Sequence, residues 1–573
     1  MKRKFWLFAA LTATLGLSAC HQTPPPVPAA TTTAETTATE APEAPAADTV
    51  VTIDLAQTGK EIHNKLSDIN MWMFQRSWLD TPLGFPSDFF AKTMPFVRRV
   101  QFMQATGGNK ERDLFLEPEN FDVLDDYNFE PLIKACENAL NQGIKPMIKT
   151  GNVPLKFSSN NTRGTFDVNL FPPDDYDEYY NYMHAMTTAL VERFGLEEVK
   201  SWRFGVFTEY ENADWFDAGD KQSTFEAYCK IYDYTAAAIE AVLGKGIDIG
   251  AHSMSVIEGL WDEEDFIRHC AEGINYYTGE KGSPLTYLAV SFYDENPNDK
   301  YKALRDMPGT VEKVRSAAVS AGLTDLEYGI DEGRILSGKK GAERADLMSR
   351  IVGQTYQAAY DARLLLQMVE HDIDYFASWG YSTAPLWGGV PSVSLHTANE
   401  FYKLVGTTRV HAETIVNTRL KRAENDALAT ISENGTAHIM AYNFGTFLGY
   451  DEARSFAFHM AGLQYNGNPA QKAKLTVTVI DDDANFFDEW MADCEANGIT
   501  AEDFHWSPDS AQISGNLRTD KARALFEANM DKYMQAAELM SQIEEVPVEN
   551  GALTLNITLP AHAVVFYTIE PIS

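Results

Sequence analysis

The 573-residue chain has few positive charges: 47 Lys and Arg stand against 82 Asp and Glu, which gives a formal net charge of −35. A surface of that sign repels nucleic-acid phosphates and anionic membranes, so we expect neither as an electrostatic partner. Cysteine is also scarce, and the five cysteines form no C-x-x-C pair and no Cys/His zinc spacing. Four of them lie far beyond the N-terminus and are expected as buried free thiols, although a disulfide stays open in an oxidising compartment.

Several catalytic motifs are absent as well. The chain contains no G-x-S-x-G nucleophile elbow, no H-E-x-x-H zinc motif and no G-x-x-x-x-G-K-[ST] phosphate loop. These absences argue against an α/β-hydrolase, a zinc protease and a P-loop nucleotide hydrolase. In contrast, 45% of the residues are apolar and 12% are aromatic, which argues against disorder and fits a large folded core.

The N-terminus is typical of an export signal. A basic start is followed by an apolar run, Phe5–Gly16, that is too short to span a bilayer. The run ends in Leu17-Ser18-Ala19-Cys20, which resembles the lipobox of bacterial lipoproteins, where cleavage leaves a lipidated Cys20 as the new N-terminus. The alternative is an ordinary signal peptide with an incidental cysteine.

We therefore predict a signal peptide over residues 1–19 and a Pro/Thr/Ala-rich flexible tether over 20–50. No later segment is apolar and long enough to span a membrane. The predicted location is the bacterial cell envelope, held by lipid. His21 stands where an aspartate would resemble an inner-membrane retention signal, so a host with two membranes is expected to anchor the protein in the outer one.

Residues 51–405 alternate short β-rich runs with long amphipathic stretches, which predicts a (β/α)₈ TIM barrel in preference to a doubly wound sheet. The expected strands are Leu66–Trp72, Phe96–Met103, Lys145–Thr150, Val199–Phe207, Ile247–Ala251, Thr286–Phe292, Leu326–Asp331 and Ile373–Trp379. Helical periodicity is clearest over Phe129–Gln142, Asp174–Phe194, Thr224–Leu243 and Ala342–Glu370.

Residues 406–573 have the pattern of an accessory β-sandwich, which the N-terminal strand Thr49–Leu55 can join. A polar excursion over 481–543 interrupts it and contains one expected helix, Thr519–Ile543. The expected sandwich strands are Ala427–Ser432, His438–Asn443, Ser455–His459, Lys474–Ile480, Leu553–Ile557 and Ala563–Ile569.

Two of the barrel strands end in a glutamate. Glu209 follows the fourth strand, and Glu332 follows the seventh. A carboxylate just past a buried apolar strand is costly unless it is paired, and catalytic groups of barrels lie at these strand ends. Paired carboxylates at this edge are typical of retaining glycosidases, in which one acts as the acid/base and the other as the nucleophile. Glu211 is the alternative acid.

The resemblance is closer than the fold class, because several short motifs resemble glycoside hydrolase family 39 in order. This family includes β-xylosidases and α-L-iduronidases. Its acid/base is followed at six and seven residues by an aromatic pair, here Trp215 and Phe216. Further similar segments are Phe96-Val97-Arg98-Arg99, Gly143-Ile144-Lys145-Pro146, Ile330-Asp331-Glu332, Ile480-Asp481 to Asn485 with Trp490, and Leu559–Val564.

The resemblance implies Glu332 as the nucleophile and Glu209 as the acid/base, with no metal ion or organic cofactor. It also implies a substrate-binding set around them, in which Arg99 keeps Glu332 ionised, Tyr293 is its hydroxyl partner and Trp379 is a stacking floor. Thr208 stands where the family has an asparagine for the sugar 2-hydroxyl, and Gln101 where it has a histidine. His252, just past the fifth strand, completes the predicted site, although a lone histidine is more often structural.

Together these features predict a lipid-anchored retaining glycosidase that acts on an oligosaccharide or polysaccharide, with β-xyloside as the family default. The oligomeric state, the sugar and exo or endo action stay open. The alternative is a surface glycan-binding lipoprotein whose barrel has lost catalysis, which the threonine at position 208 favours. A third possibility is a purely structural envelope lipoprotein.

Overall fold

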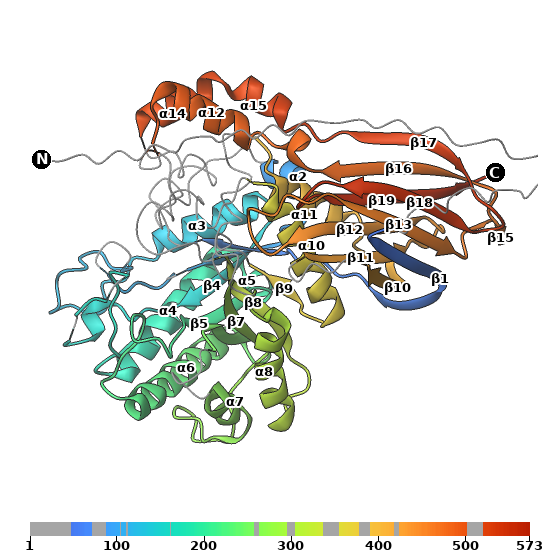
Figure 1. The fold of residues 1–573 in the computed structure, drawn as a ribbon. Helices are drawn as coiled ribbons and strands as arrows, with labels where there is room; N and C mark the ends of the chain where they lie inside the picture. The colour runs from blue at the N-terminus through green and yellow to red at the C-terminus, as the bar shows by residue number, and fades with distance from the viewer. Residues whose placement is uncertain are drawn as a thin grey trace, which may run out of the picture. The chain divides into compact units, whose positions relative to one another are not determined.

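The computed structural model (Figure 1) describes residues 47–71, 88–103, 105–109, 113–160, 162–164, 166–256, 263–294, 304–335, 354–377, 390–417, 423–500, 503 and 519–573. Ala47–Ser573 form one compact unit. The predicted signal peptide with Cys20 lies outside the described residues, as does Trp379. In the described ranges, no helix is both long enough and apolar enough to cross a membrane.

The N-terminal part of the fold is built around an eight-stranded parallel sheet. Its order follows the chain: β2 (Asp68–Met71), β3 (Arg99–Phe102), β4 (Lys145–Thr150), β5 (Arg203–Thr208), β6 (Asp248–Met254), β7 (Tyr287–Asp294), β8 (Glu327–Ile335) and β9 (Tyr375–Phe376). The sheet nearly closes, because the backbone N–H of Phe376 donates to the carbonyl of Lys65, just before β2, over 2.9 Å. This confirms the predicted (β/α)₈ barrel.

The connecting helices surround this sheet (Figure 1): α2 (Phe89–Thr93), α3 (Glu130–Asn141), α4 (Tyr176–Phe194), α5 (Leu196–Lys200), α6 (Lys221–Leu243), α7 (Glu263–Glu272), α8 (Met307–Ser320), α10 (Tyr356–Glu370) and α11 (Val393–Tyr402). Local sequence sets their ends. Asp175 caps α4 by accepting from the N–H groups of its first turn, and Gly195, at φ +88°, ends it.

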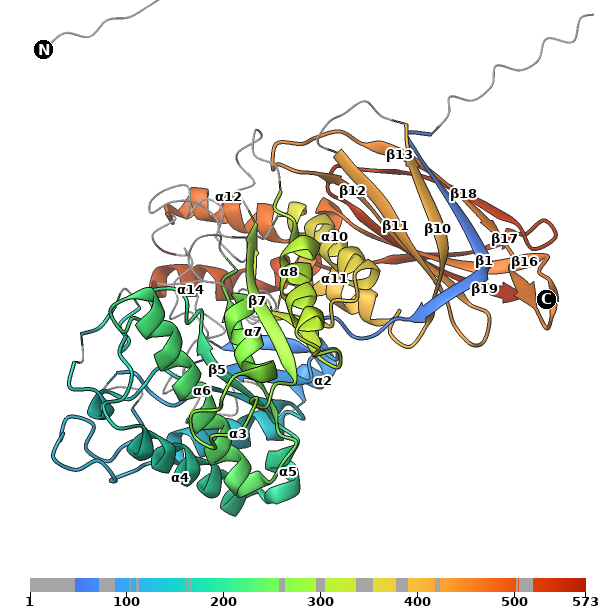
Figure 2. The same ribbon diagram turned by 90° about the horizontal axis from the view of Figure 1, so that it is seen from below.

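A nine-stranded sheet makes up the second part (Figure 2). Its order is β17 (Ser541–Pro547), β16 (Lys472–Ile480), β19 (Val564–Ile572), β12 (Ala437–Gly445), β11 (Ala423–Ile431), β10 (Thr408–Val416), β1 (Thr49–Glu61), β13 (Arg454–Ala461) and β18 (Leu553–Leu559). Only two residue pairs join β10 to β11, so the sheet folds over at this point. The Phe458 and Tyr567 rings, from β13 and β19, meet at 5.4 Å across the fold, which gives a sandwich core.

The sandwich is fixed to the barrel through β12. All nine residues of Ala437–Gly445 are buried, because one face of the strand looks into the sandwich core and the other onto α10. Met440, Tyr442 and Phe444 belong to the barrel's own hydrophobic cluster, and the Phe444 ring lies 5.3 Å from that of Tyr356 on α10. The barrel's hydrophobic cluster therefore extends onto one face of β12, while the other face of this strand belongs to the separate core of the sandwich.

Several elements differ from the sequence prediction. The helix predicted over Thr519–Ile543 is wrong: α14 (Asp520–Ala528) and α15 (Met530–Ala536) are separated at Asn529, and β17 begins at Ser541. Strand β17 is exposed over most of its length, so no apolar alternation marked it as a strand. The start of the strand predicted over Val199–Phe207 is occupied by α5 instead. Residues 342–353 of another predicted helix lie outside the described residues.

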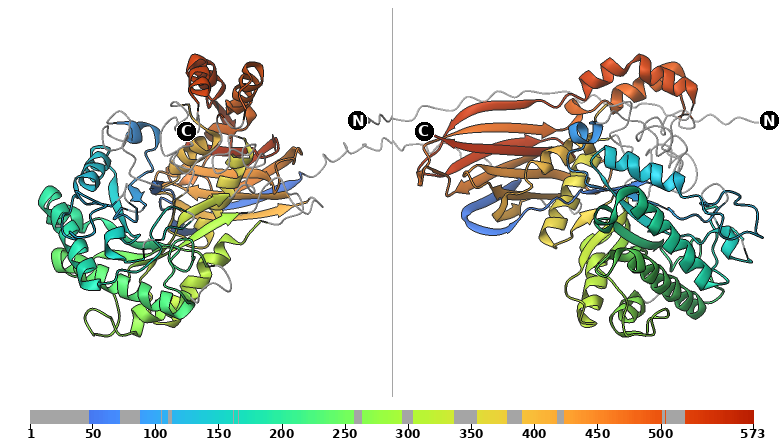
Figure 3. Two further views of the ribbon diagram at one scale, coloured as in Figure 1. Left: turned by 90° about the vertical axis from the view of Figure 1, so that its left-hand side faces the viewer. Right: turned by 180° about the vertical axis from the view of Figure 1, so that it is seen from behind.

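A further helix of the polar excursion is α12 (Phe487–Asn497), which lies with α14 and α15 on one side of the molecule (Figure 3, orange-red helices). Their buried rings form a cluster with barrel residues that follow strand ends, namely Met103, Val168, Trp215 and Val390. His396 Nε2 on α11 also lies 2.8 Å from the carbonyl oxygen of Ala537. This helical insertion therefore packs against the edge of the barrel where catalytic groups are expected. The four cysteines beyond Cys20 are all buried and free.

Candidate active site

The two predicted catalytic glutamates come from the carboxyl-terminal part of barrel strands. Glu209 directly follows β5, the fourth strand of the barrel, and Glu332 lies in β8, the seventh. Parallel strands of a closed barrel present these ends on one face. Both glutamates therefore belong to the same edge, and their roles stay predictions.

An irregularity in β8 places two successive carboxylates at this edge. The register with β7 shifts between the pairs Val290–Ile330 and Ser291–Glu332, which leaves Asp331 as the extra residue. Side chains normally alternate across a strand, whereas an extra residue interrupts the alternation. Asp331 is fully buried and Glu332 is only 6% exposed, so both carboxylates are removed from water.

The partner of Glu332 lies on the neighbouring strand. The hydroxyl of Tyr293, near the end of β7, donates to Glu332 Oε1 over 2.5 Å. Such a bond stabilises the charged carboxylate and restricts its rotation. Tyr293 thus has the position that the family resemblance implies for it.

Asp331 is held by three strands of the barrel. Its Oδ1 atom accepts from Gln101 Nε2 and from the Tyr375 hydroxyl, each over 2.7 Å, and its backbone oxygen accepts from Asn70 Nδ2 over 2.8 Å. Gly329 makes room for the Tyr375 ring, which lies where a side chain at that position would have to be. Burial raises the pKa of Asp331 to about 6. These contacts fix the backbone from which Glu332 projects.

Glu209 lies in a tight turn and is only partly buried. Its φ angle is +39°, its N–H donates to the carbonyl of Ser253 over 3.0 Å, and its Oε2 atom accepts from Asn212 Nδ2 over 3.0 Å. Thr208, the residue before it, is buried, and its hydroxyl has no hydrogen-bond partner among the described residues. The turn therefore contains a partly exposed carboxylate, that of Glu209, directly after the buried Thr208.

The alternative acid, Glu211, is placed differently. It is 3% exposed, and one of its oxygens accepts from the N–H of Ser255, which ties two βα loops together. Burial, together with the charges of Glu209 and Glu263, raises its pKa to about 8. The adjacent Tyr210 ring stacks on Tyr228 at 3.7 Å, so this part of the turn faces the protein interior. This placement favours Glu209 over Glu211 as the acid.

The prediction that Arg99 accompanies Glu332 is wrong. Arg99 is the first residue of β3, and its guanidinium binds Asp68 at 2.8 and 3.1 Å and lies 3.6 Å from Glu327 and 3.9 Å from Asp248. Those carboxylates are likewise the first residues of their strands, so this ion-pair cluster lies at the amino-terminal end of the barrel. The sequence-based strand began three residues too early, which shifted Arg99 toward the catalytic end.

Two other predicted residues lie partly or wholly outside the described residues. The backbone of His252 belongs to β6 and pairs with Thr208, but its side chain lies outside the described residues, as does the whole of Trp379.

The aromatic pair after Glu209 is buried: Trp215 is 2% exposed and stacks on Phe166 at 4.2 Å, below the helical insertion. Trp215 supports the loop and offers no open stacking surface.

Sequence reasoning missed Lys149. It is the fifth residue of β4 and is 1% exposed, and its ammonium lies 2.8 Å from the thioether sulfur of Met103. Burial lowers its pKa to about 7, while the charges of Glu332, Asp331 and Glu209 oppose that change. The available signal was a lysine in the second half of the predicted strand Lys145–Thr150, directly after the apolar residues Met147 and Ile148.

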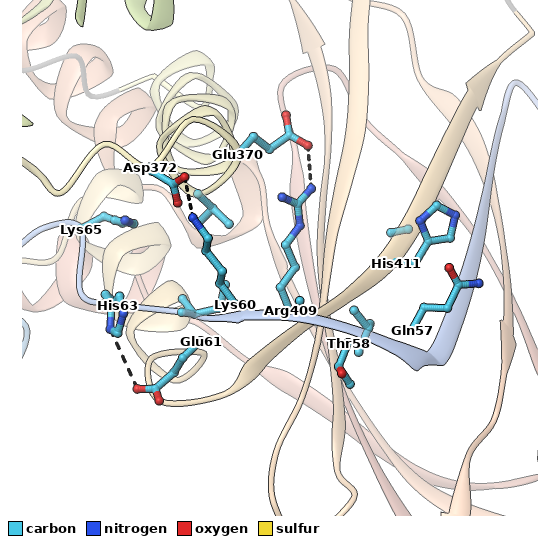
Figure 4. A pocket seen from close by; sticks show the side chains of 15 residues that line it. Gln57, Thr58, Lys60, Glu61, His63, Lys65, Glu370, Asp372, Arg409 and His411 are labelled. Carbon is cyan, nitrogen blue, oxygen red and sulfur yellow. Dashed lines mark hydrogen bonds and ion pairs between the residues drawn. The ribbon is translucent and has the colours of Figure 1, made fainter. Parts of the chain in front are cut away.

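A pocket of about 440 Å³ lies elsewhere (Figure 4). It is formed by the second half of β1, the start of β10 and the end of α10. It contains two ion pairs, Lys60 with Asp372 at 2.7 Å and Arg409 with Glu370 at 2.8 Å, and no phenylalanine, tyrosine or tryptophan lines it. None of the glutamates considered as catalytic lines this pocket, so it is not the candidate active site.

Comparison with known proteins supports a carbohydrate-active barrel. The family model described as "Glycosyl hydrolases family 39" matches residues 113–410. A β-xylosidase of Geobacillus stearothermophilus is 29% identical over 147 residues, which cover 26% of this chain and 28% of that enzyme. A β-xylosidase of Caldicellulosiruptor saccharolyticus is 24% identical over 288 residues, or 48% of this chain and 55% of that enzyme. The chain thus spans about a quarter to a half of the length of these curated relatives.

Solved structures show the same fold. The crystal structure of a monomeric β-xylosidase from Caulobacter crescentus superposes with a TM-score of 0.63 at 15% identity, over 91% of this chain and 100% of that one. The match extends through both the barrel and the β-sandwich, since it covers more of the chain than either part alone.

Proposed function

Because the chain belongs to glycosyl hydrolase family 39, we propose that it is a retaining glycosidase that cleaves O-glycosidic bonds of oligosaccharides or polysaccharides. The observation that carries this proposal is the placement of Glu209 and Glu332 at one edge of the barrel, at the ends of its fourth and seventh strands. The expected substrate is a β-xyloside, the substrate class named for two of the relatives.

In the proposed reaction, Glu332 attacks the anomeric carbon while Glu209 donates a proton to the leaving oxygen, which breaks the glycosidic bond. Glu209 then takes a proton from water, and the hydroxide attacks the glycosyl-enzyme and releases Glu332. Two inversions give net retention. The Tyr293 hydroxyl supports the first step because it holds Glu332 Oε1 in place and favours its ionised form.

The division of labour is tested by replacing each glutamate and adding azide. The Glu209→Ala variant keeps its nucleophile, so activated aryl glycosides should retain part of their rate, and azide should restore turnover with a glycosyl azide of retained configuration. The Glu332→Ala variant should lose several orders of magnitude, and azide should give a product of inverted configuration. The opposite anomers would exchange the two roles, and full activity of both variants would remove the site.

The second candidate is a glycan-binding protein without catalysis. Thr208 motivates it, because a short buried hydroxyl replaces the family's asparagine at the sugar-binding position. A panel of aryl glycosides separates the two functions. Turnover of any of them supports the enzyme, whereas tight glycan binding without turnover supports the binding protein.

We also propose that the protein is held to the bacterial cell envelope by a lipid on Cys20. The argument is the sequence Leu17-Ser18-Ala19-Cys20 after a short apolar run, followed by a Pro/Thr/Ala-rich stretch. A tether of this kind would leave the barrel free to reach a polymeric substrate.

A further inference from the structure

The edge of the barrel that carries the proposed catalytic residues contains two adjacent buried carboxylates. Asp331 is fully buried and Glu332 is 6% exposed. A nucleophile must be ionised, and a buried carboxylate ionises only when hydrogen bonds or a nearby positive charge stabilise the anion. The cation predicted for this purpose, Arg99, lies at the other end of the barrel in its ion pair with Asp68. The Tyr293 hydroxyl supplies one stabilising hydrogen bond, and a positive charge from another strand would stabilise the anion further.

Lys149 is placed to do so. It lies near the carboxyl end of β4, between β3 and β5, and its register partner on β5 is Gly205. Register partners on neighbouring strands share a face of the sheet, and Gly205 has no side chain that could occupy that face beside Lys149. The Lys149 carbonyl accepts from the N–H of Ala105 over 3.0 Å, which fixes the backbone at this point.

The ammonium of Lys149 has no ion pair within 4 Å among the described residues. It contacts the thioether sulfur of Met103 at 2.8 Å, an uncharged and weak acceptor. The Lys149 ammonium is therefore not neutralised by a direct ion pair with one described carboxylate. The charged groups that act on it through the barrel interior are Glu332 and Asp331 from β8 and Glu209 after β5.

We propose that Lys149 is a positioning residue of the reaction, whose buried ammonium keeps Glu332 ionised and ready to attack. The inference rests on the proposed function of Glu332 as the nucleophile. In this proposal, Lys149 on β4 keeps Glu332 ionised, which is the role that the family resemblance implied for Arg99.

The linkage is reciprocal, since each charge favours the ionisation of the other. Burial lowers the pKa of Lys149 to about 7, with the three carboxylates acting against this. Lys149 is charged below that pH and loses its proton as the pH rises through it. Removal of the Glu332 charge should lower the pKa of Lys149 further, and removal of Lys149 should raise the pKa of Glu332.

The first test does not depend on activity. The full chain is labelled with ¹³C at the lysine ε carbons, and the Lys149 signal is assigned by its loss in Lys149→Arg. We expect the signal to titrate near pH 7 and its midpoint to fall by about one pH unit in Glu332→Gln. A Lys149 midpoint that Glu332→Gln leaves unchanged would overturn the proposal.

The second test is kinetic and uses 4-nitrophenyl β-D-xylopyranoside. In Lys149→Met, the acidic limb of the kcat/KM profile should move upward by about one pH unit or more, whereas Lys149→Arg should keep it near the wild-type position. Lys60→Met, which removes an exposed lysine on β1, is the matched control and should leave the profile unchanged. A uniform loss at every pH, without a shift of the limb, would reduce Lys149 to a packing role and contradict the proposal.

The two tests separate the possible failures. If the wild-type chain turns over no aryl glycoside, the proposed function fails, and the titration of Lys149 still shows whether the two charges are coupled. If the wild type is active and the limb does not move in a folded Lys149→Met variant, only the role of Lys149 fails. Should that variant not fold, Lys149→Arg and the labelled Glu332→Gln protein decide the question.

Discussion

Replacement of the buried Glu211 by glutamine should make the protein more stable at alkaline pH. Glu211 is 3% exposed, and burial with the nearby charges of Glu209 and Glu263 raises its pKa from 4.5 to about 8. The folded state therefore holds a proton on Glu211 that the unfolded chain releases above pH 4.5. Glu211 therefore does not reduce the free energy of unfolding below pH 4.5, and it reduces this free energy progressively as the pH rises from 4.5 to about 8.

The size of the effect follows from the same linkage. At about 1.4 kcal/mol per pH unit, the interval from 4.5 to about 8 corresponds to about 4–5 kcal/mol of unfolding free energy. Glutamine cannot titrate, and its oxygen can still accept from the N–H of Ser255. Glu211→Gln should thus match the wild type near pH 5 and exceed it progressively toward pH 8.5.

Thermal unfolding of both proteins at pH 5, 6, 7, 8 and 8.5 measures this difference. Glu544→Gln, on the exposed strand β17, is the control and should follow the wild type at every pH. A Glu211→Gln variant that is less stable at pH 8.5, or that differs from the wild type by the same amount at every pH, would refute a buried and protonated Glu211.

Three further outcomes are expected. Arg99→Met leaves the buried Asp68 without its cation and should cost about 3–5 kcal/mol of stability, measured by thermal unfolding. The acidic limb of the pH–activity profile should stay in place, and a shifted limb would return Arg99 to the catalytic site. Tyr293→Phe removes a hydrogen bond to charged Glu332 of about 1.5–3 kcal/mol, so kcat/KM for an aryl glycoside should fall about 10- to 100-fold, and an unchanged value would remove Tyr293 from the mechanism. Cys20→Ser should leave the protein unprocessed or released, as judged by detergent-phase partitioning of cell extracts, and membrane retention of a processed variant would contradict lipid attachment.

Sequence patterns were sufficient for the architecture because the barrel strands are short apolar runs between strongly amphipathic helices. Strand β4 was predicted over its observed range, Lys145–Thr150. Strand β17 was missed because its residues are mostly exposed, and the edge position in the sheet, rather than burial, defines it. Hydrophobic periodicity contains no information about such an edge strand.

The site was only partly predictable. Glu209 and Glu332 could be predicted as catalytic because each directly follows an apolar strand, and that pattern is local in the sequence. The environment of Glu332 is not local: it depends on the register shift in β8 and on side chains from other strands. A shift of three residues in the start of β3 was enough to misplace Arg99, and Lys149 became visible only once the barrel interior was assembled.

The most direct test of the central claim, that this chain forms a glycosyl-enzyme on Glu332, is covalent trapping. The full chain is incubated with 2-deoxy-2-fluoro-β-D-xylopyranosyl fluoride, whose fluorine slows release of the intermediate more than its formation, and its proteolytic peptides are analysed by mass spectrometry. The account predicts one added 2-fluoroxylosyl group per chain, located on Glu332, and its absence in Glu332→Gln. A label on Glu209 or on another carboxylate, or rapid hydrolysis of the reagent to a product of inverted configuration without any label, would contradict it.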